Sequence, residues 1–209
     1  MFLDELPEFK RTVLEVLRQP LEDKVVTISR AKATVQFPAN FMLVASMNPS
    51  PSGEFYSADG SHPDSPAAVQ RYLSKISGPL LDRIDIHIEV NPVSFEKMTG
   101  DQKMESSADI RERVIAARER QIERFKDTDI HSNAMMSAPM VKEYCKINTA
   151  GKALLKTAME RLGLSSRAYD RILKVSRTIA DLSGKDDILV EHLAEAIQYR
   201  SLDRGGWLG

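Results

Sequence analysis

The sequence predicts a chain in two parts, an α/β part followed by an all-helical part. Short apolar and β-branched runs alternate with helical patterns over residues 1–97, whereas helical periodicity alone continues over residues 107–209. Residues 98–106 between them are mostly polar and are typical of a linker. We therefore expect an α/β domain, a linker and a helical domain with these boundaries.

Composition is typical of a globular protein, because 42% of the 209 residues are hydrophobic. The 29 Lys and Arg residues nearly cancel the 30 Asp and Glu residues, so any binding of anions must come from local clusters. The single cysteine, Cys145, excludes an internal disulfide. No apolar run approaches the ~20 residues that span a bilayer, so we expect a cytoplasmic protein with no membrane partner.

The α/β part begins with MFLDE, an apolar run that ends in two carboxylates. Apolar residues at helical spacing predict a helix over Phe9–Leu17, which Pro20 should end. Two β-branched runs, Val25–Ser29 and Ala33–Phe37, flank Arg30-Ala31-Lys32. They predict a β-hairpin with a basic tip.

The next apolar run, Phe41–Ala45, predicts a strand covered on both faces, with Asn48 just after its carboxyl end. Residues 49–66 are rich in Pro, Ser, Gly and Asp and predict a surface loop. A helix should begin near Ser65 and be broken at Gly78-Pro79, and Ile86–Val90 predicts another strand.

Five helices are predicted in the second part, with Gly163 and Gly184 as stop signals. Their expected ranges are 107–126, 137–146, 149–162, 166–183 and 190–201.

Asp4 and Glu5 are the first candidates for chemistry. At the carboxyl end of a buried strand, one carboxylate can hold a hydrated Mg²⁺ while the next polarises a water molecule. The alternative is a pair of exposed carboxylates near the start of a helix, where the helix dipole favours them.

Asn48 and Arg83 each have two interpretations. Asn48 could orient an attacking water or contact a γ-phosphate, or it could form an Asx turn before Pro49. Arg83 lies between two aspartates in LLDRID. It could form a surface ion pair worth under about 1 kcal/mol, or offer its guanidinium to a phosphate on a neighbouring subunit.

Basic residues form two further candidates. Arg167 and Arg171 share one helical face, with Lys174 and Arg177 nearby, and they suggest either an anionic ligand or a solvated basic face. The hairpin residues 30 and 32 could grip nucleic-acid phosphates, or only protect the ribbon from edge pairing.

His87 and His192 have no Cys or second His at metal-binding spacing, and we interpret both as structural. Cys145 beside Tyr144 is interpreted as a core residue.

The order of these motifs resembles an AAA+ ATPase from the Walker B motif onward. FLDE is followed by a hairpin, then LVASMNP, ISGPLLDRID and a helical part with LSSRAYDRIL. Longer stretches such as LPEFKRTVLEVLRQPLED and QRYLSKISGPLLDRIDIHIEV resemble the magnesium-chelatase-like family, and the resemblance covers nearly the whole chain. It implies the C-terminal half of an AAA+ core followed by a helical lid, as part of a longer protein.

The resemblance also implies a role for each candidate. Asp4 matches the Walker B acid that holds the Mg²⁺ of ATP, and Glu5 matches the catalytic base. Asn48 matches sensor 1, and Arg83 matches the arginine finger donated around a ring. Arg167 matches the sensor 2 arginine, which contacts nucleotide from the lid.

At the level of function, the resemblance implies a ring, expected to be hexameric, that uses ATP to remodel DNA by branch migration or helicase action. The hairpin matches an insertion before sensor 1 that points toward DNA, with Arg30 and Lys32 at its tip. Two rivals remain open: an ATPase subunit that drives metal insertion by a chelatase, and a non-catalytic interaction domain.

Two features depart from the family pattern. No GxxxxGK[ST] motif is present, since Gly151-Lys152 and Gly184-Lys185 lack the required neighbours, so this chain alone should not hydrolyse ATP. The sequence NPSPSG stands where family members commonly carry NPCPCG, and serine is a poor zinc ligand, so no zinc site is expected.

Overall fold

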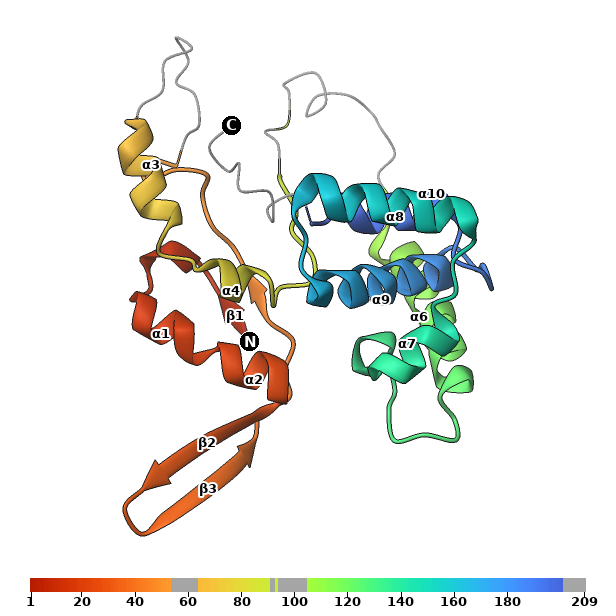
Figure 1. Ribbon diagram of the computed structural model, residues 1–209, viewed down its shortest axis with the longest axis horizontal. Coiled ribbons are helices and arrows are strands. Elements are labelled where there is room, and N and C mark those ends of the chain that lie inside the picture. Colours follow the sequence, from red (N-terminus) through yellow and green to blue (C-terminus); the bar gives the residue numbers. More distant parts are fainter. Residues whose placement is uncertain (54–63, 91–92, 94–104, 201–209) are drawn as a thin grey trace. The chain divides into compact units, whose positions relative to one another are not determined.

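A computed structural model describes residues 1–53, 64–90, 93 and 105–200 of the protein (Figure 1). The described residues form two compact units, the first from Met1 to Ile84 and the second from Asp85 to Arg200. The architecture is mixed α/β, mostly helical, with little sheet. The predicted linker lies almost wholly outside the described residues, as does most of the predicted loop after Pro49.

The first unit contains two small sheets. Strand β1 (Phe2–Leu3) pairs in parallel with β4 (Val44–Ala45), and β2 (Val25–Arg30) pairs antiparallel with β3 (Ala33–Pro38). The predicted hairpin is therefore confirmed, and Figure 1 shows it extending away from the helices of its unit. Those helices are η1 (Leu6–Glu8), α1 (Arg11–Val16), α2 (Arg18–Asp23), α3 (Pro66–Leu73) and α4 (Gly78–Leu81).

The core of the first unit is small. It consists of four buried side chains, Leu6, Leu14, Ile76 and Leu80, with partly buried apolar neighbours such as Leu3. Ser65 and Ser77 begin α3 and α4 because their hydroxyl oxygens accept the N–H groups of Ala68 and Leu80, at 3.2 and 3.3 Å. These caps fix the first residues of the two helices that follow the loop.

The single helix predicted over Phe9–Leu17 is wrong in extent. Two short helices, α1 and α2, occupy residues 11–23, and Pro20 lies inside α2 instead of ending a helix. Proline is tolerated there because the first four N–H groups of a helix have no partner within the helix. Gly78-Pro79 likewise begins α4 behind the Ser77 cap.

One predicted strand is shorter and more exposed than expected, and another is wrong. Within the part of the chain that the structure describes, the run Phe41–Ala45 contributes only Val44 and Ala45 to a sheet, and both side chains are exposed. The continuous apolar run therefore overstates the burial of this segment. Ile86–Val90 is not a strand, and His87 N–H donates to the Tyr199 carbonyl at 2.8 Å, within the second unit.

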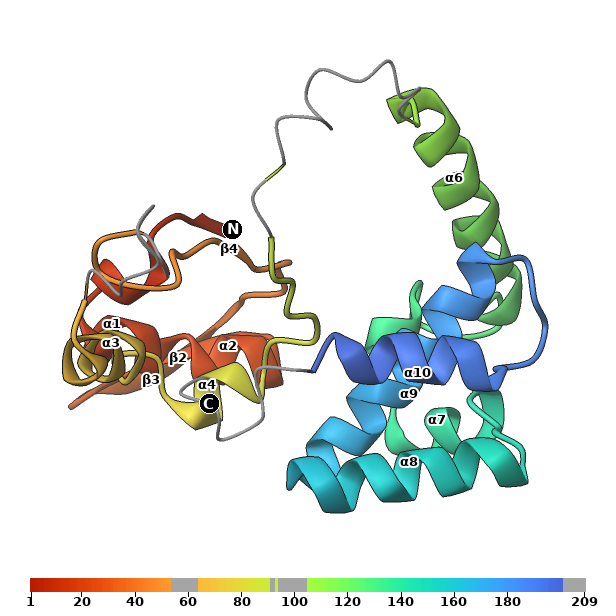
Figure 2. The same ribbon diagram turned by 90° about the horizontal axis from the view of Figure 1, so that it is seen from above.

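The second unit is helical, and the five predicted helices are confirmed within a few residues. They are α6 (Ser107–Arg124), α7 (Ala138–Tyr144), α8 (Thr149–Leu162), α9 (Ser166–Leu182) and α10 (Val190–Gln198), with a short 3-10 turn η2 (Asn133–Met135). Helix α9 packs against α6, α7 and α10 and lies among them in Figure 2. Its apolar face meets a core that includes Phe125, Ile172 and Leu193.

Candidate functional site

The carboxyl ends of β1 and β4 lie at one edge of their small sheet, because the strands are parallel and Leu3 pairs with Ala45. Asp4 follows β1 at this edge, and the Ser46 hydroxyl donates a hydrogen bond to its Oδ1. The Glu5 N–H donates to the same oxygen at 3.1 Å, and Leu6 N–H donates to the Ser46 carbonyl at 2.9 Å. Asp4 is thereby fixed at the end of the sheet.

Glu5 leaves the strand with left-handed backbone angles, φ 51° and ψ 50°, which few residues other than glycine adopt. The turn begins η1, in which Glu8 N–H donates to the Glu5 carbonyl at 2.8 Å. Asp4 and Glu5 are both exposed. Strained backbone of this kind concentrates at functional sites, which makes the turn a candidate for holding Glu5 in a working orientation.

Asn48 lies two residues beyond Ser46 and is exposed. Its main-chain N–H donates to the hydroxyl oxygen of Tyr72 in α3, a buried residue. Burial and the negative charge of Glu8 raise the pKa of the Tyr72 hydroxyl, while the hydrogen bond to Asn48 opposes the rise. Tyr72 thus supports the segment that carries Asn48.

The donors at this edge are hard oxygens, the kind that Mg²⁺ prefers. In residues 1–53, 64–90, 93 and 105–200, no three His, Cys, Asp or Glu side chains gather to hold a metal ion. Asp4 and Glu5 could therefore bind Mg²⁺ only as one or two carboxylates beside water and phosphate oxygens. The donor set fits the Mg²⁺ of a bound nucleotide, because this ion keeps several waters and needs few protein ligands.

Arg83 follows α4 and is held within the first unit. Its guanidinium forms an ion pair with Glu22 of α2 and donates to the Pro79 carbonyl at 2.7 Å. Only 8% of its side chain is exposed. Its ion pair with Glu22 joins α4 to α2 within the first unit.

The basic residues of α9 do not share one environment. Arg167 is exposed, and Arg171 forms an ion pair with Asp85. Lys174 Nζ donates to the Ala134 carbonyl at 3.2 Å. Arg177 is buried, so it is not part of a solvated basic face.

Arg177 belongs instead to a buried ionic network that the sequence did not indicate. Asp181 accepts two hydrogen bonds from Arg124, at 2.6 and 2.8 Å, and one from the Asn133 amide at 2.8 Å. Arg177 Nε adds another at 3.2 Å. Burial raises the pKa of Asp181, but the bonds from Arg124 and Asn133 outweigh it and hold that pKa below its ordinary value.

The basic tip of the hairpin is exposed, with Arg30 ending β2 and Lys32 in the turn. The register also creates one polar and one apolar face, because Thr27 pairs with Gln36 whereas Ile28 pairs with Val35. Ile28 and Val35 are 47% and 46% exposed. The alternation of apolar and polar residues along both strands is a sequence signal for this two-faced hairpin.

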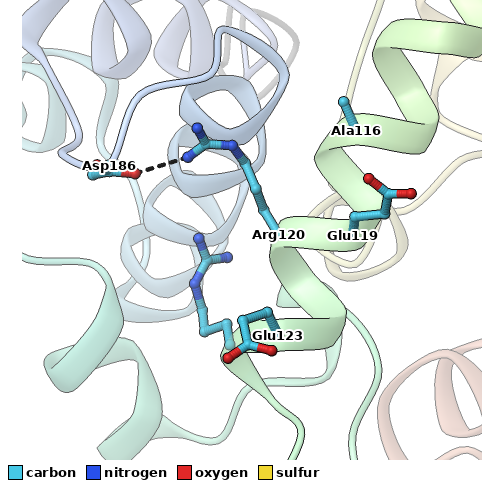
Figure 3. A pocket seen from close by; sticks show the side chains of 6 residues that line it. Ala116, Glu119, Arg120, Glu123 and Asp186 are labelled. Carbon is cyan, nitrogen blue, oxygen red and sulfur yellow. Dashed lines mark hydrogen bonds and ion pairs between the residues drawn. The ribbon is translucent and has the colours of Figure 1, made fainter.

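A shallow hollow on the second unit does not coincide with any predicted site residue. Ala116, Glu119, Arg120, Glu123, Arg124 and Asp186 line it. Figure 3 shows Arg120 pointing toward Asp186. Arg120 Nη1 donates to Asp186 Oδ1 at 2.8 Å. Arg120 also donates to the Gly184 carbonyl at 2.9 Å, so its hydrogen bonds hold the turn after α9.

His87, His192 and Cys145 are all buried. His87 is buried, and His192 Nδ1 accepts the Leu189 N–H at the start of α10, at 3.1 Å. Cys145 is buried in the helical core, and burial raises the pKa of its thiol to about 11. None of the helices that the structure describes has the length and apolar character to span a membrane.

Comparison with known proteins identifies the family. The family described as "Magnesium chelatase, subunit ChlI" matches residues 1–98, and "Magnesium chelatase, subunit ChlI C-terminal" matches residues 104–200. The chain therefore belongs to the magnesium-chelatase-like family of AAA+ ATPases.

Its curated relatives include the competence protein ComM of Haemophilus influenzae, which is 50% identical over 207 residues. The uncharacterized protein YifB of Escherichia coli is 42% identical over 210 residues, and an uncharacterized Mycobacterium tuberculosis protein is 35% identical over 204 residues. These matches cover 96% to 98% of the chain but only 39% of each relative.

Proposed function

We propose that the chain is the C-terminal part of a ring-forming AAA+ ATPase that remodels DNA. The observation that carries this proposal is the shared edge of β1 and β4. There the Ser46 hydroxyl donates a hydrogen bond to Asp4, and Asn48 follows two residues after Ser46. Residues 1–97 would be part of the ATPase core, 98–106 a linker and 107–209 the helical lid. The ring would be a homo-oligomer of six subunits.

At the nucleotide, each residue would have a separate role. Asp4 would bind the Mg²⁺ of ATP, which neutralises phosphate charge, and Glu5 would accept a proton from the attacking water. Asn48 would orient that water. Arg83 would reach the γ-phosphate of the neighbouring subunit after releasing Glu22, and Arg167 would contact nucleotide from the lid.

Support for action on DNA comes from the hairpin and from one relative. The exposed Arg30 and Lys32 stand at the tip of a projecting ribbon, where cations can contact phosphates without reading sequence. The relative ComM is named as a competence protein. Branch migration or helicase action during recombination or transformation fits both features.

The ATPase part is tested with Glu5→Gln in the full-length protein. We expect hydrolysis to fall by at least about a hundredfold while ATP binding is kept, because the base is lost but the fold is not. Glu8→Gln is the matched control, since Glu8 is an exposed carboxylate in the same turn. Equal activity of the two variants would refute the role of Glu5.

The DNA part is tested by single-turnover branch migration of a synthetic four-way junction. Lys32→Ala should slow migration while the rate of ATP hydrolysis is kept. Lys152 is an exposed lysine of α8, and Lys152→Ala should change neither rate. The 209-residue chain alone should hydrolyse no ATP, because it has no GxxxxGK[ST] motif.

A chelatase role is the second candidate, favoured by the family description itself. It predicts robust ATP hydrolysis without any activity on junctions or forked DNA. A non-catalytic interaction domain is the third, and it would be excluded by hydrolysis that depends on Glu5.

A further inference from the structure

The chain passes from the first unit to the second between Ile84 and Asp85. Just before this point, Arg83 is held in the first unit by Glu22 and by the Pro79 carbonyl. Its N–H also donates to the Leu80 carbonyl at 3.0 Å. Ile84 N–H likewise donates to the Leu81 carbonyl at 3.0 Å, so the segment that bears the proposed arginine finger is anchored in its unit up to the boundary.

The second unit anchors the chain at once on the other side. Asp85 forms an ion pair with Arg171 of α9, and His87 N–H donates to the Tyr199 carbonyl at 2.8 Å. The His87 side chain is buried. Within three residues of the boundary, the segment is therefore fixed at two points.

Helix α9 carries both Arg171 and Arg167, which lie one turn apart on the same face. Only Ile84 separates Asp85 from Arg83, so the two Cα atoms can be at most about 7 Å apart. A change in the orientation of α9 must therefore reach Arg83 through a very short connection.

We infer that the Asp85–Arg171 ion pair is a positioning device that couples the arginine finger to the sensor 2 helix. This inference rests on the proposed function, because it takes Arg83 and Arg167 as the two arginines that contact nucleotide. Asp85 and Arg171 touch no nucleotide in this account. They make the segment that bears Arg83 follow α9 when the lid responds to ATP.

Loss of the pair should alter position more than stability, because half of the Asp85 side chain is exposed. A geometric error at a reacting centre costs rate even when its source is distant. The expected signature of a positioning residue is therefore a fall in kcat, with little change in the KM for ATP or in the unfolding temperature.

The test uses Asp85→Ala and Arg171→Ala in the full-length protein, with Asp85→Glu to keep the charge. Both alanine variants should lose about tenfold in kcat, with KM changed less than about twofold, and Asp85→Glu should recover most of the loss. Arg113→Ala is the matched control, because it removes an exposed ion pair with Glu105 from the same unit.

Each adverse outcome has a distinct meaning. A wild-type protein without ATPase activity would refute the proposed function, and the coupling with it. An active wild-type protein in which Asp85→Ala behaves like Arg113→Ala would refute the coupling alone. A raised KM with unchanged kcat would also refute it, because the pair would then support binding and not position.

Discussion

The two units differ in how completely they bury their apolar side chains. Among the residues that the structure describes, the core cluster of the helical unit has twelve buried members, whereas that of the first unit has four. In the first unit, Phe2, Val16 and Met42 are 65%, 67% and 77% exposed. In the second unit, exposed apolar residues such as Ile88 and Val90 lie in the segment before the helices, and others such as Ile122 lie on α6.

This difference indicates which unit is stabilised mainly by contacts within itself. A two-residue parallel pair and a four-residue core are small for an α/β domain, because marginal sheets need further strands or helices to be stable. The helical unit instead combines a closed core with a buried ionic network. We expect it to unfold later than the first unit, and to resist limited proteolysis longer.

The largest effect should come from Asp181→Asn in the helical unit. This change leaves Arg124 and Arg177 without their carboxylate partner, and loss of one partner of a buried pair costs about 3–5 kcal/mol. Urea unfolding of the 209-residue chain, followed by circular dichroism, measures the loss. Asp186→Asn is the control, because its exposed side chain pairs with Arg120 and should contribute under about 1 kcal/mol.

The same network predicts a dependence on pH. The pKa of Asp181 in the folded unit lies below its ordinary value of 3.8, so the unfolded chain takes up this proton first as pH falls. The contribution to stability is present above pH 3.8 and is lost as pH falls through the folded pKa. The stability of Asp181→Asn should lack this dependence on pH. If the variant and the wild-type chain showed the same pH dependence of unfolding, Asp181 would not be its source.

Leu14→Ala should have the next largest effect, this time in the first unit. Leu14 is fully buried, and such truncations cost about 2–5 kcal/mol. Val13→Ala in the same helix is the matched control, because Val13 is 51% exposed. If both variants unfolded alike, the small core of the first unit would not be the source of its stability.

The local features of the sequence were enough to predict much of this fold. β-Branched runs around Arg30-Ala31-Lys32 gave the hairpin, and helical periodicity with polar starts gave the five helices of the second unit. The predicted start at residue 107 is within one residue of the observed cap, where Ser106 and Asp109 form a capping box. Signals of this kind act within a few residues and can be read from one chain.

The features that the sequence did not predict depend on distant partners. Arg83 pairs with Glu22, which is 61 residues away, and Arg124 pairs with Asp181, 57 residues away. The apolar run Ile86–Val90 predicts a strand, but the structure has none there. An apolar run does not reveal whether a neighbouring strand is present. At the candidate site, the sequence placed Asp4 after a strand, but the bond from Ser46 required the register of β1 and β4.

A smaller effect is expected from Gly163→Ala at the end of α8. Gly163 has φ 60°, a left-handed conformation that costs a residue with a Cβ about 1 kcal/mol, although no atom lies within 4 Å of the added carbon. Gly78→Ala is the control, because its added carbon also meets no atom within 4 Å and its backbone is not left-handed. Equal unfolding midpoints for the two variants would contradict a backbone cause.

The smallest effect should come from Phe37→Ala on the apolar face of the hairpin. Phe37 is 51% exposed, and surface substitutions usually change the free energy of unfolding by less than about 0.5 kcal/mol. Urea unfolding of the 209-residue chain again provides the measurement. A loss above about 1 kcal/mol would mean that this face is covered, so that the first unit buries more apolar surface than its four-residue core indicates. The difference in buried apolar surface between the two units would then be smaller than the core clusters indicate, and the hairpin would be the source of the discrepancy.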